Sequence, residues 1–251
     1  MMSRSQSAPA TLLAFDTSTE LLSVALHKAP QQSWCVNERG GKEASARLLP
    51  CIQELLAQAG LKVQGLDAIA FGRGPGAFTG LRTSCAVAQG LAFAAGLPVI
   101  GIDSLLIVAE DARLQRADPA APLQIGVAMD GRMDEIYASV YHWEGGAWQV
   151  QTEAALYTLP ALLEAWGDAC PAVLAGSALN AFGARLALPA RPIYPTERDR
   201  AAALLRLAQQ KFAAGEAVDA ALALPVYLRD KVALTTPERE AVRALKTGAL
   251  P

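Results

Sequence analysis

The segment at residues 71–82, Phe-Gly-Arg-Gly-Pro-Gly-Ala-Phe-Thr-Gly-Leu-Arg, constrains the fold of this chain more than any other. The apolar run at 66–71 predicts a buried strand that ends at Gly72. Closely spaced glycines and Pro75 then require a tight, irregular loop. Thr79 is a candidate N-cap for a helix that continues to about residue 95. The segment therefore predicts a strand, a glycine-rich loop and a helix in direct succession.

The glycine-rich loop has two interpretations. It can present backbone N–H groups and a positive helix end to an anion, with Arg73 and Gly74 as candidate phosphate contacts. Alternatively, its glycines let the helix pack closely on the sheet. It is not a P-loop, because no Gly-Lys-Ser/Thr follows, and its glycine spacing differs from the dinucleotide-binding fingerprint. The sequence alone leaves anion binding and close packing both open.

The composition limits the classes of partner. The chain has 251 residues and a net charge of −2, which argues against a broad nucleic-acid-binding surface. With 52% hydrophobic and 18% charged residues, it needs a large core or an apolar partner surface. The apolar stretch at 85–102 is interrupted by glycines and Pro98, so it predicts helix, turn and strand instead of a membrane span. No membrane association is expected.

The cysteines indicate neither a disulfide framework nor a zinc site. They are scattered, with no close pair, at Cys35, Cys51, Cys85 and Cys170. Residues 1–10 contain no long apolar run and predict a short disordered leader instead of a signal peptide. These features favour a cytoplasmic protein.

The order of elements in the first half predicts an α/β lobe with a mixed sheet. Residues 11–15 and 21–27 form a strand hairpin, and a third strand covers 33–38. Apolar residues at helical spacing predict a helix over 44–59, which either begins near Pro50 or kinks there. The glycine-rich segment follows, and 98–102 forms another strand.

The second half repeats this pattern. Residues 123–129 and 135–141 form a second hairpin, in which Asp130 falls on Asp16 of the first. A later strand at 172–175 leads into Gly176, as the strand of the first half leads into Gly72. One α/β unit is therefore predicted to be duplicated with divergence. We expect a leader at 1–10, lobes at 11–105 and 106–215, and a C-terminal segment with a polar tail at 216–251 that returns to the first lobe.

An aspartate at each hairpin turn suggests the two-lobed actin/hexokinase arrangement, in which facing turns hold nucleotide phosphates and Mg²⁺. The alternative is that these aspartates only form the turns. The candidate nucleotide or phosphate contacts are Asp16, Thr17, Arg73, Gly74 and Asp130. No His-x-x-x-His, His-Glu-x-x-His or Gly-x-Ser-x-Gly occurs, so the sequence shows no recognisable catalytic constellation.

Small residues recur every fourth position along the helix that follows the glycine-rich loop, at Gly80, Ser84, Ala88 and Ala92. Such a row allows another helix to approach closely. The neighbour can be an element of the same chain or a helix of a partner. Both alternatives remain at this point.

Several motifs together resemble the TsaB (YeaZ) family of bacterial tRNA threonylcarbamoyladenosine synthesis. They are the stretches at 13–19, 71–82, 89–92, 98–102, 129–132 and 225–229. The resemblance covers about residues 11–233. It implies two duplicated actin-like (ASKHA, RNase H-like) lobes with mixed sheets. It also implies a non-catalytic subunit that binds TsaD, which transfers threonylcarbamoyl to adenosine 37 of tRNA.

The resemblance implies further properties of the site. The subunit would have no intrinsic cofactor, with ATP or ADP and Mg²⁺ bound only in the assembled complex. TsaE would join TsaD there, and tRNA would be reached through the complex. In the catalytic paralogue a His-x-x-x-His pair on the first long helix binds the metal, whereas residues 42–47 here contain no histidine.

Family members pair through their first two helices, which here map to 44–59 and 79–95. The same surface would form a homodimer when no partner is present. An arginine in place of Ala88 is expected to block partner binding and leave the fold intact. The alternatives are an autonomous ATP-binding phosphotransferase and a metallopeptidase-like protein. The candidate partner-binding residues are Leu48, Ile52, Leu55, Leu81, Cys85, Ala88 and Ala92.

Overall fold

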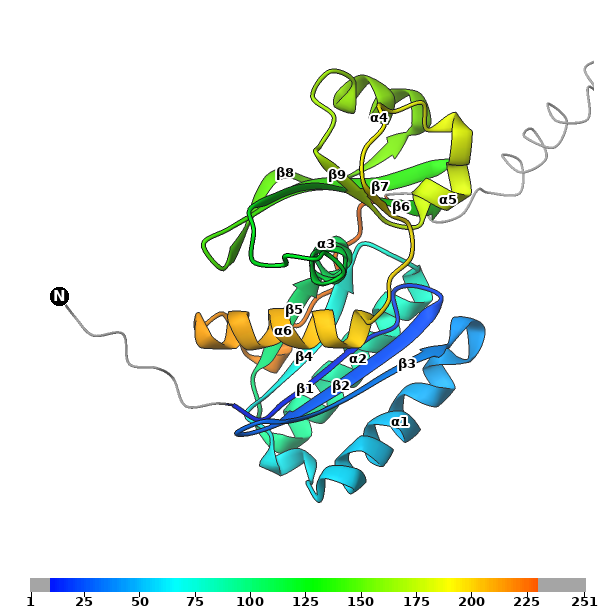
Figure 1. Cartoon of the computed structure of the whole chain (residues 1–251). Coiled ribbons are helices and arrows are strands. Elements are labelled where there is room, and N and C mark those ends of the chain that lie inside the picture. Colours follow the sequence, from blue (N-terminus) through cyan, green and yellow to red (C-terminus); the bar gives the residue numbers. More distant parts are fainter. Residues whose placement is uncertain (1–9, 230–251) are drawn as a thin grey trace, which may run out of the picture.

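The computed structural model describes residues 10–229. Figure 1 shows two lobes, each built on a sheet, with helices α3 and α6 between them. The expected polar tail and all but the last residue of the expected leader lie outside the described residues. Among residues 10–229, no helix combines the length and apolar character needed to cross a membrane.

The first lobe contains a five-stranded mixed sheet in the order β3-β2-β1-β4-β5. β1, β2 and β3 are antiparallel neighbours, whereas β4 and β5 run parallel to β1. Every residue of β1 is buried, because helices cover both faces of the sheet. The strands are β1 (Leu12–Asp16), β2 (Leu21–Lys28), β3 (Gln32–Arg39), β4 (Ala68–Gly74) and β5 (Val99–Asp103).

The second lobe repeats the first. Its sheet order is β10-β9-β6-β7-β8, so in both lobes the third strand pairs with the second, the second with the first, the first with the fourth and the fourth with the fifth. The predicted pair of duplicated actin-like lobes is confirmed. The strands are β6 (Leu123–Arg132), β7 (Glu135–Glu144), β8 (Ala147–Thr158), β9 (Val173–Ala175) and β10 (Ile193–Tyr194).

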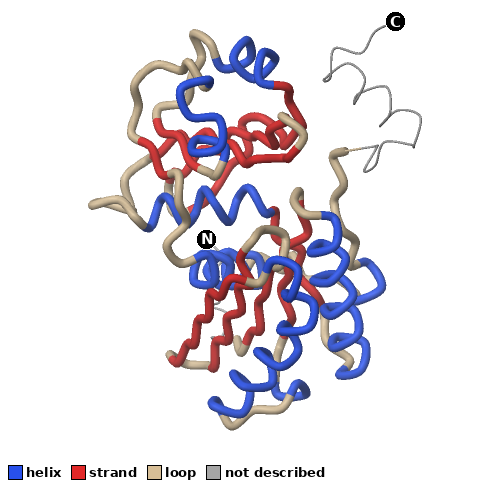
Figure 2. The backbone as a smooth tube through the Cα atoms, turned by 90° about the vertical axis from the view of Figure 1, so that its right-hand side faces the viewer, coloured by secondary structure: helices blue, strands red, loops and turns tan. Residues whose placement is uncertain are grey.

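The helices form three layers around the two sheets (Figures 1 and 2). α1 and α2 cover the outer face of the first sheet, α4 and α5 pack on the second sheet, and α3 and α6 lie between the sheets. The helices are α1 (Ala44–Ala59), α2 (Phe78–Ala95), α3 (Ser104–Leu114), α4 (Leu159–Trp166), α5 (Ala178–Phe182) and α6 (Arg200–Ala213).

The two outer helices of the first lobe were largely predicted from the sequence. α1 has the predicted bounds, contains Pro50 and ends at Gly60, whose φ of 62° suits glycine. α2 begins one residue before Thr79, and Ala77 is its N-cap. The prediction of Thr79 as the N-cap is therefore wrong. The Ala77 N–H donates to the Ser18 carbonyl, and Leu81 donates to the Ala77 carbonyl, so packing on the first hairpin fixes the earlier start.

The lobes share one core. A single cluster of buried side chains combines strands of both sheets with α3 and α6. Residues 103–122, expected to run without strand character between the lobes, contain α3, whose residues are buried except Leu114. α6 lies in the range expected for the second lobe, yet it packs on β1 and β2 of the first sheet.

The chain returns to the first lobe after α6. We call residues 216–229 the C-terminal strap. Val218 bridges to Val99 of β5, and the short 3-10 helix η4 (Ala220–Leu222) packs on α2. Farther on, the Val226 N–H donates to the Arg73 carbonyl over 2.7 Å. The strap thus crosses from the edge of the first sheet towards the second lobe.

Candidate functional site

A cleft of about 1000 Å³ lies between the lobes. Both hairpin turns line it, with residues 18–21 on one side and 129–132 on the other. The glycine-rich loop contributes residues 75–78, and the strap contributes 226–229. A volume of this size is at the upper end of the range for small-molecule sites. This cleft is where an actin-like fold would place a nucleotide.

The lining of the cleft is largely apolar and aromatic. Its apolar side chains include Leu21, Phe78, Leu81, Met129 and Tyr137. The charged side chains in the lining are Arg39, Arg132 and Arg229 together with Glu20, Asp130 and Glu197. Arg132 and Arg229 are already paired with the carboxylates of Glu20 and Glu135, so two of the three cations in the lining are not free for a polyphosphate.

Asp16 does not face the cleft. Its side chain is fully buried and accepts two hydrogen bonds on Oδ2 from Arg200 of α6, at 2.8 and 2.6 Å. Arg200 also pairs with Glu197. Burial alone would lower the pKa of Arg200, but the carboxylates of Glu197 and Asp16 raise it above its ordinary value. The carboxylate expected at a Mg²⁺ site is thus neutralised inside the protein.

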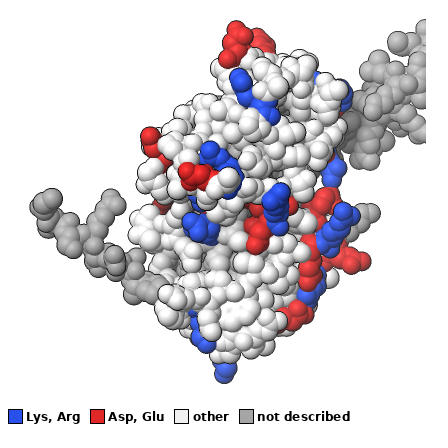
Figure 3. All heavy atoms as spheres, in the orientation of Figure 1, with Lys and Arg blue, Asp and Glu red and all other residues white. Residues whose placement is uncertain are grey.

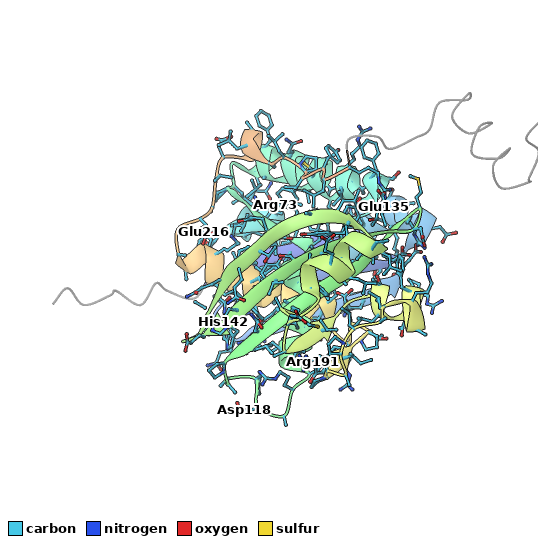
Figure 4. All side chains as sticks on the ribbon, turned by 90° about the horizontal axis from the view of Figure 1, so that it is seen from above. Arg73, Asp118, Glu135, His142, Arg191 and Glu216 are labelled. Carbon is cyan, nitrogen blue, oxygen red and sulfur yellow. The ribbon has the colours of Figure 1, made fainter. Side chains whose placement is uncertain are left out.

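Thr17, Gly74 and Arg73 also lie outside the cleft lining. The Thr17 N–H donates to Ser84 Oγ at 3.0 Å, and its hydroxyl donates to the Gly80 carbonyl at 2.7 Å. The Gly74 N–H donates to a serine hydroxyl of α3. Arg73 lines a separate small pocket with Glu216, away from Glu135 of the second hairpin (Figure 4).

Asp130 is the one candidate of these five that lines the cleft. Its Oδ1 accepts from the Arg132 N–H at 2.9 Å, and its Oδ2 lies 3.3 Å from Arg132 Nη1. Arg132 Nη2 continues across the cleft to Glu20 Oε1 at 2.6 Å. The two duplicated turns are therefore joined by an ion pair. The structure does not bring the five candidates together as one nucleotide site.

Gly76 of the loop and Gly80 of the first turn of α2 allow close packing on the first hairpin turn. A Cβ at Gly76 would lie 2.5 Å from the Ser18 carbonyl oxygen, and one at Gly80 would lie 1.8 Å from the Thr17 carbonyl oxygen. Real Cβ atoms do not approach oxygen so closely, so only glycine fits at either position. The geometry supports the second interpretation of the loop, in which glycines let α2 and its loop pack against the first hairpin turn.

The candidate partner-binding residues are buried within the chain. Six of them pack in the core of the first lobe from α1 and α2, and Leu81 lies in the cleft lining with 1% of its surface exposed, so none of them forms an exposed surface in this conformation. Ala88 is fully buried, and an arginine there would disrupt the core instead of selectively blocking a partner. The residues concerned are Leu48, Ile52, Leu55, Leu81, Cys85, Ala88 and Ala92.

The opposite sides of α1 and α2 are exposed. From residue 83 onward the exposed side of α2 carries small and apolar side chains, whereas that of α1 mixes Leu49 and Pro50 with polar residues such as Gln53 and Glu54. Phe93 is 83% exposed and Leu49 is 43% exposed. A hydrogen bond of 2.9 Å between Ser45 Oγ and Thr83 Oγ1 joins the two helices. No residue from 83 to 95 is charged. We call this surface the helix-pair face, formed by Leu49, Pro50, Ala86, Gly90, Phe93 and Ala94.

The spacing singled out the row of α2 that contains Ala88, but a second row of small residues, Ala86, Gly90 and Ala94, has the same spacing of four and is the exposed one. Helical geometry places Ala86 and Gly90 opposite Ala88, but because both rows consist of small residues the spacing does not show which row is exposed. In α1, Leu48 is buried and the adjacent Leu49 is exposed, so residue type alone does not identify the exposed side of that helix either.

The charges on the face shown in Figure 3 and the metal-ligating groups of the described residues do not indicate a second kind of site. Within residues 10–229, no three His, Cys, Asp or Glu side chains are grouped so as to hold a metal ion. Acidic and basic side chains are interspersed on the face shown in Figure 3, so no single-sign patch dominates it.

Comparison with known proteins identifies the family. The family model for TsaD, tRNA N6-adenosine threonylcarbamoyltransferase, matches residues 30–235. The tRNA threonylcarbamoyladenosine biosynthesis protein TsaB of Escherichia coli is 35% identical over 88% of this chain and 96% of its own length. The chain belongs to the TsaB family. The resemblance inferred from the motifs is confirmed.

Two further TsaB relatives agree with this assignment. TsaB of Haemophilus influenzae is 47% identical over 51% of this chain and 52% of its own length. The structure of YeaZ from Pseudomonas aeruginosa superimposes with a TM-score of 0.76 at 38% identity, covering 87% of this chain and 100% of that one. Sequence and fold therefore place the chain in the same family.

Proposed function

We propose that this chain is a non-catalytic subunit that binds TsaD in the cytoplasm and supports the transfer of threonylcarbamoyl to adenosine 37 of tRNA. The names of its TsaB relatives support a role in tRNA threonylcarbamoyladenosine biosynthesis. The match to the TsaD model supports common descent with the transferase, so family membership alone does not separate catalyst from accessory subunit.

The observation that carries the proposal is the helix-pair face. Phe93 projects from the uncharged stretch 83–95 of α2, in which Ala86 and Gly90 leave room for a close neighbour, and Leu49 of α1 is also exposed. A Cβ at Gly90 would meet no atom within 4 Å. Contiguous exposed apolar surface of this kind is typical of protein–protein interfaces. A partner helix can pack on it as one helix packs on another within a domain.

The buried pair of Asp16 and Arg200 supports a non-catalytic role. A carboxylate that neutralises a buried guanidinium has lost the free charge that a metal–nucleotide complex requires. This pair argues against an autonomous phosphotransferase that would hold Mg²⁺ through Asp16. The lack of a grouped set of metal ligands among residues 10–229 argues against a metallopeptidase-like activity. ATP or ADP and Mg²⁺ bind only in the assembled complex, where TsaE joins TsaD. The free chain pairs with a second copy through the helix-pair face.

Binding of the full-length chain to its cognate TsaD tests the proposal. Titration calorimetry should detect a complex for the wild type, and Phe93→Asp should weaken it at least about tenfold, because it places a charge in an apolar contact. Val150→Asp is the matched control, since Val150 is an exposed apolar residue, at 50%, that lies on β8 of the other lobe.

A reconstituted modification assay supplies the functional readout. TsaD with the other components should modify tRNA when the wild-type chain or the Val150→Asp variant is present, and poorly with Phe93→Asp. Equal modification without any form of this chain would refute the accessory role, as would modification by this chain when TsaD is left out.

A further inference from the structure

The C-terminal strap exposes its large apolar side chains and buries its small ones. Ala220 and Ala223 are buried in the core cluster that contains α2. Leu222 and Leu224, on either side of Ala223, are 63% and 66% exposed. Large aliphatic side chains are among those most often found inside proteins, so this arrangement is the reverse of the usual one. It suggests that the two leucines are covered in an assembly.

The strap is fixed at this place by α2. The Ala223 carbonyl accepts from Cys85 Sγ at 3.1 Å and from Gln89 Nε2 at 2.8 Å. Farther along, the ring of Tyr227 packs on Phe78 at 5.1 Å between centroids. Two consecutive turns of α2 therefore fix the backbone at Ala223, between the two exposed leucines. The outward direction of the leucine side chains follows from these hydrogen bonds.

The exposed leucines lie on the same side of α2 as Phe93. Residues four apart form one row on a helix, so Cys85, Gln89 and Phe93 are successive members of one row. The first two hold Ala223 of the strap, and Phe93 is the next member, with its ring 83% exposed. Phe93 thus continues the apolar surface that begins at Leu222 and Leu224.

We infer that the strap is part of the surface that binds the catalytic partner, with Leu222 and Leu224 as contact residues beside Phe93. This inference rests on the proposed function. The occupant is an apolar, helical surface of TsaD. It would lie over the small residues Ala86 and Gly90, between the strap on one side of α2 and α1 on the other.

Two observations favour this occupant. The proposed helix-pair face continues directly into the strap through Phe93, so a partner that covers α2 also reaches the leucines. Residues 83–95 and 220–228 contain no charged side chain, which fits an apolar helix. The charged side chains that share a small pocket with the leucines, Arg73, Lys211 and Glu216, are of both signs and so do not select an acidic or a basic partner.

Binding of cognate TsaD to full-length variants tests the inference. Leu222→Asp with Leu224→Asp should weaken binding at least about tenfold, because two desolvated carboxylates would replace apolar contacts. The replacements should leave the melting temperature nearly unchanged, since both side chains are mostly exposed in the free chain. Val150→Asp and Phe93→Asp are measured in parallel.

The outcomes separate the inference from the proposed function. If Phe93→Asp weakens binding and the strap variant does not, the strap lies outside the interface and the inference is wrong while the accessory role stands. If the wild type does not bind TsaD, the proposed function fails with it. If light scattering shows that the strap variant loses only self-association, the leucines contact a second copy of this chain, which also overturns the inference.

Discussion

Asp16 and Arg200, 184 positions apart in the chain, form a fully buried ion pair in which Arg200 donates from both Nε and Nη2 to one carboxylate oxygen. Asp16 ends β1, and Arg200 begins α6. The pair fixes the helix that returns from the second half of the chain onto the first hairpin. The pair also gives a structural role to the Asp16 carboxylate, which from sequence alone is a candidate metal ligand.

Replacement of Asp16 by alanine should therefore destabilise the fold strongly. The change leaves the Arg200 guanidinium buried beside Glu197 alone, and removal of one partner of a buried pair costs about 3–5 kcal/mol. Urea denaturation followed by circular dichroism measures the loss. Asp130→Ala is the matched control, because Asp130 sits at the equivalent turn and is partly exposed, so its loss should stay below about 1 kcal/mol. Equal losses for the two variants would contradict this account.

The fold was predictable because local signals agreed with one another. The hairpins, α1 and the strand before the glycine-rich loop follow from apolar periodicity and from glycine at the ends of elements. The duplication followed from Asp16 and Asp130 at equivalent turns. α3 was missed because it is buried on nearly all sides, so its sequence lacks the polar stripe that marks a surface helix.

The site was less predictable because its decisive contacts are distant in sequence. Nothing near Asp16 indicates that Arg200 will neutralise it. The two faces of α2 both carry small residues, so spacing alone could not tell Ala88, which is buried, from Ala86, which is exposed. Only the packing of α2 on the first sheet decides between them.

The glycines of α2 should respond oppositely to alanine. Gly80→Ala should lower the melting temperature, because its Cβ would lie 1.8 Å from the Thr17 carbonyl oxygen and force the hairpin turn to move. Gly90→Ala should raise stability by about 0.5–1 kcal/mol, since its Cβ meets no atom within 4 Å and alanine favours the helix. Thermal denaturation of both variants tests the pair, and a stabilised Gly80→Ala protein would refute the close-packing role of the loop.

Asp103 should make stability depend on pH. It caps α3 by accepting from the Leu105 N–H, and it accepts from the Tyr141 hydroxyl at 3.2 Å. Burial raises the pKa of Asp103 above its ordinary value of 3.8, despite the nearby Arg73. As pH rises from about 4, the unfolded chain therefore loses the Asp103 proton before the folded protein does. The contribution of Asp103 to the free energy of unfolding then declines until the folded carboxyl has also ionised.

The variant Asp103→Asn isolates that contribution, because asparagine keeps the cap and the acceptor for Tyr141 without titrating. The free energy of unfolding of the variant minus that of the wild type should increase as pH rises from about 4 towards neutrality. Urea titrations at several pH values measure it. A difference that stays constant or decreases over this range would show that the Asp103 carboxyl is not held in its protonated form by burial.

Two alanines of α2, Ala86 and Ala88, should separate folding from partner binding. Ala88 has no exposed surface and packs in the core of the first lobe, so Ala88→Arg would bury an unpaired charge and overfill that core. It should lower the melting temperature severely or prevent folding.

Ala86, two positions earlier, is exposed on the helix-pair face, so Ala86→Arg should leave the melting temperature nearly unchanged. It should still weaken binding of TsaD at least about tenfold, because the arginine would separate two closely packed helices and lose water in doing so. Circular dichroism and titration calorimetry on both variants provide the two readouts. The opposite result would be a folded Ala88→Arg protein that binds TsaD more weakly and an Ala86→Arg protein that binds it as the wild type does. That result would place the partner on the Ala88 side of α2 and require the helix to leave the sheet on binding.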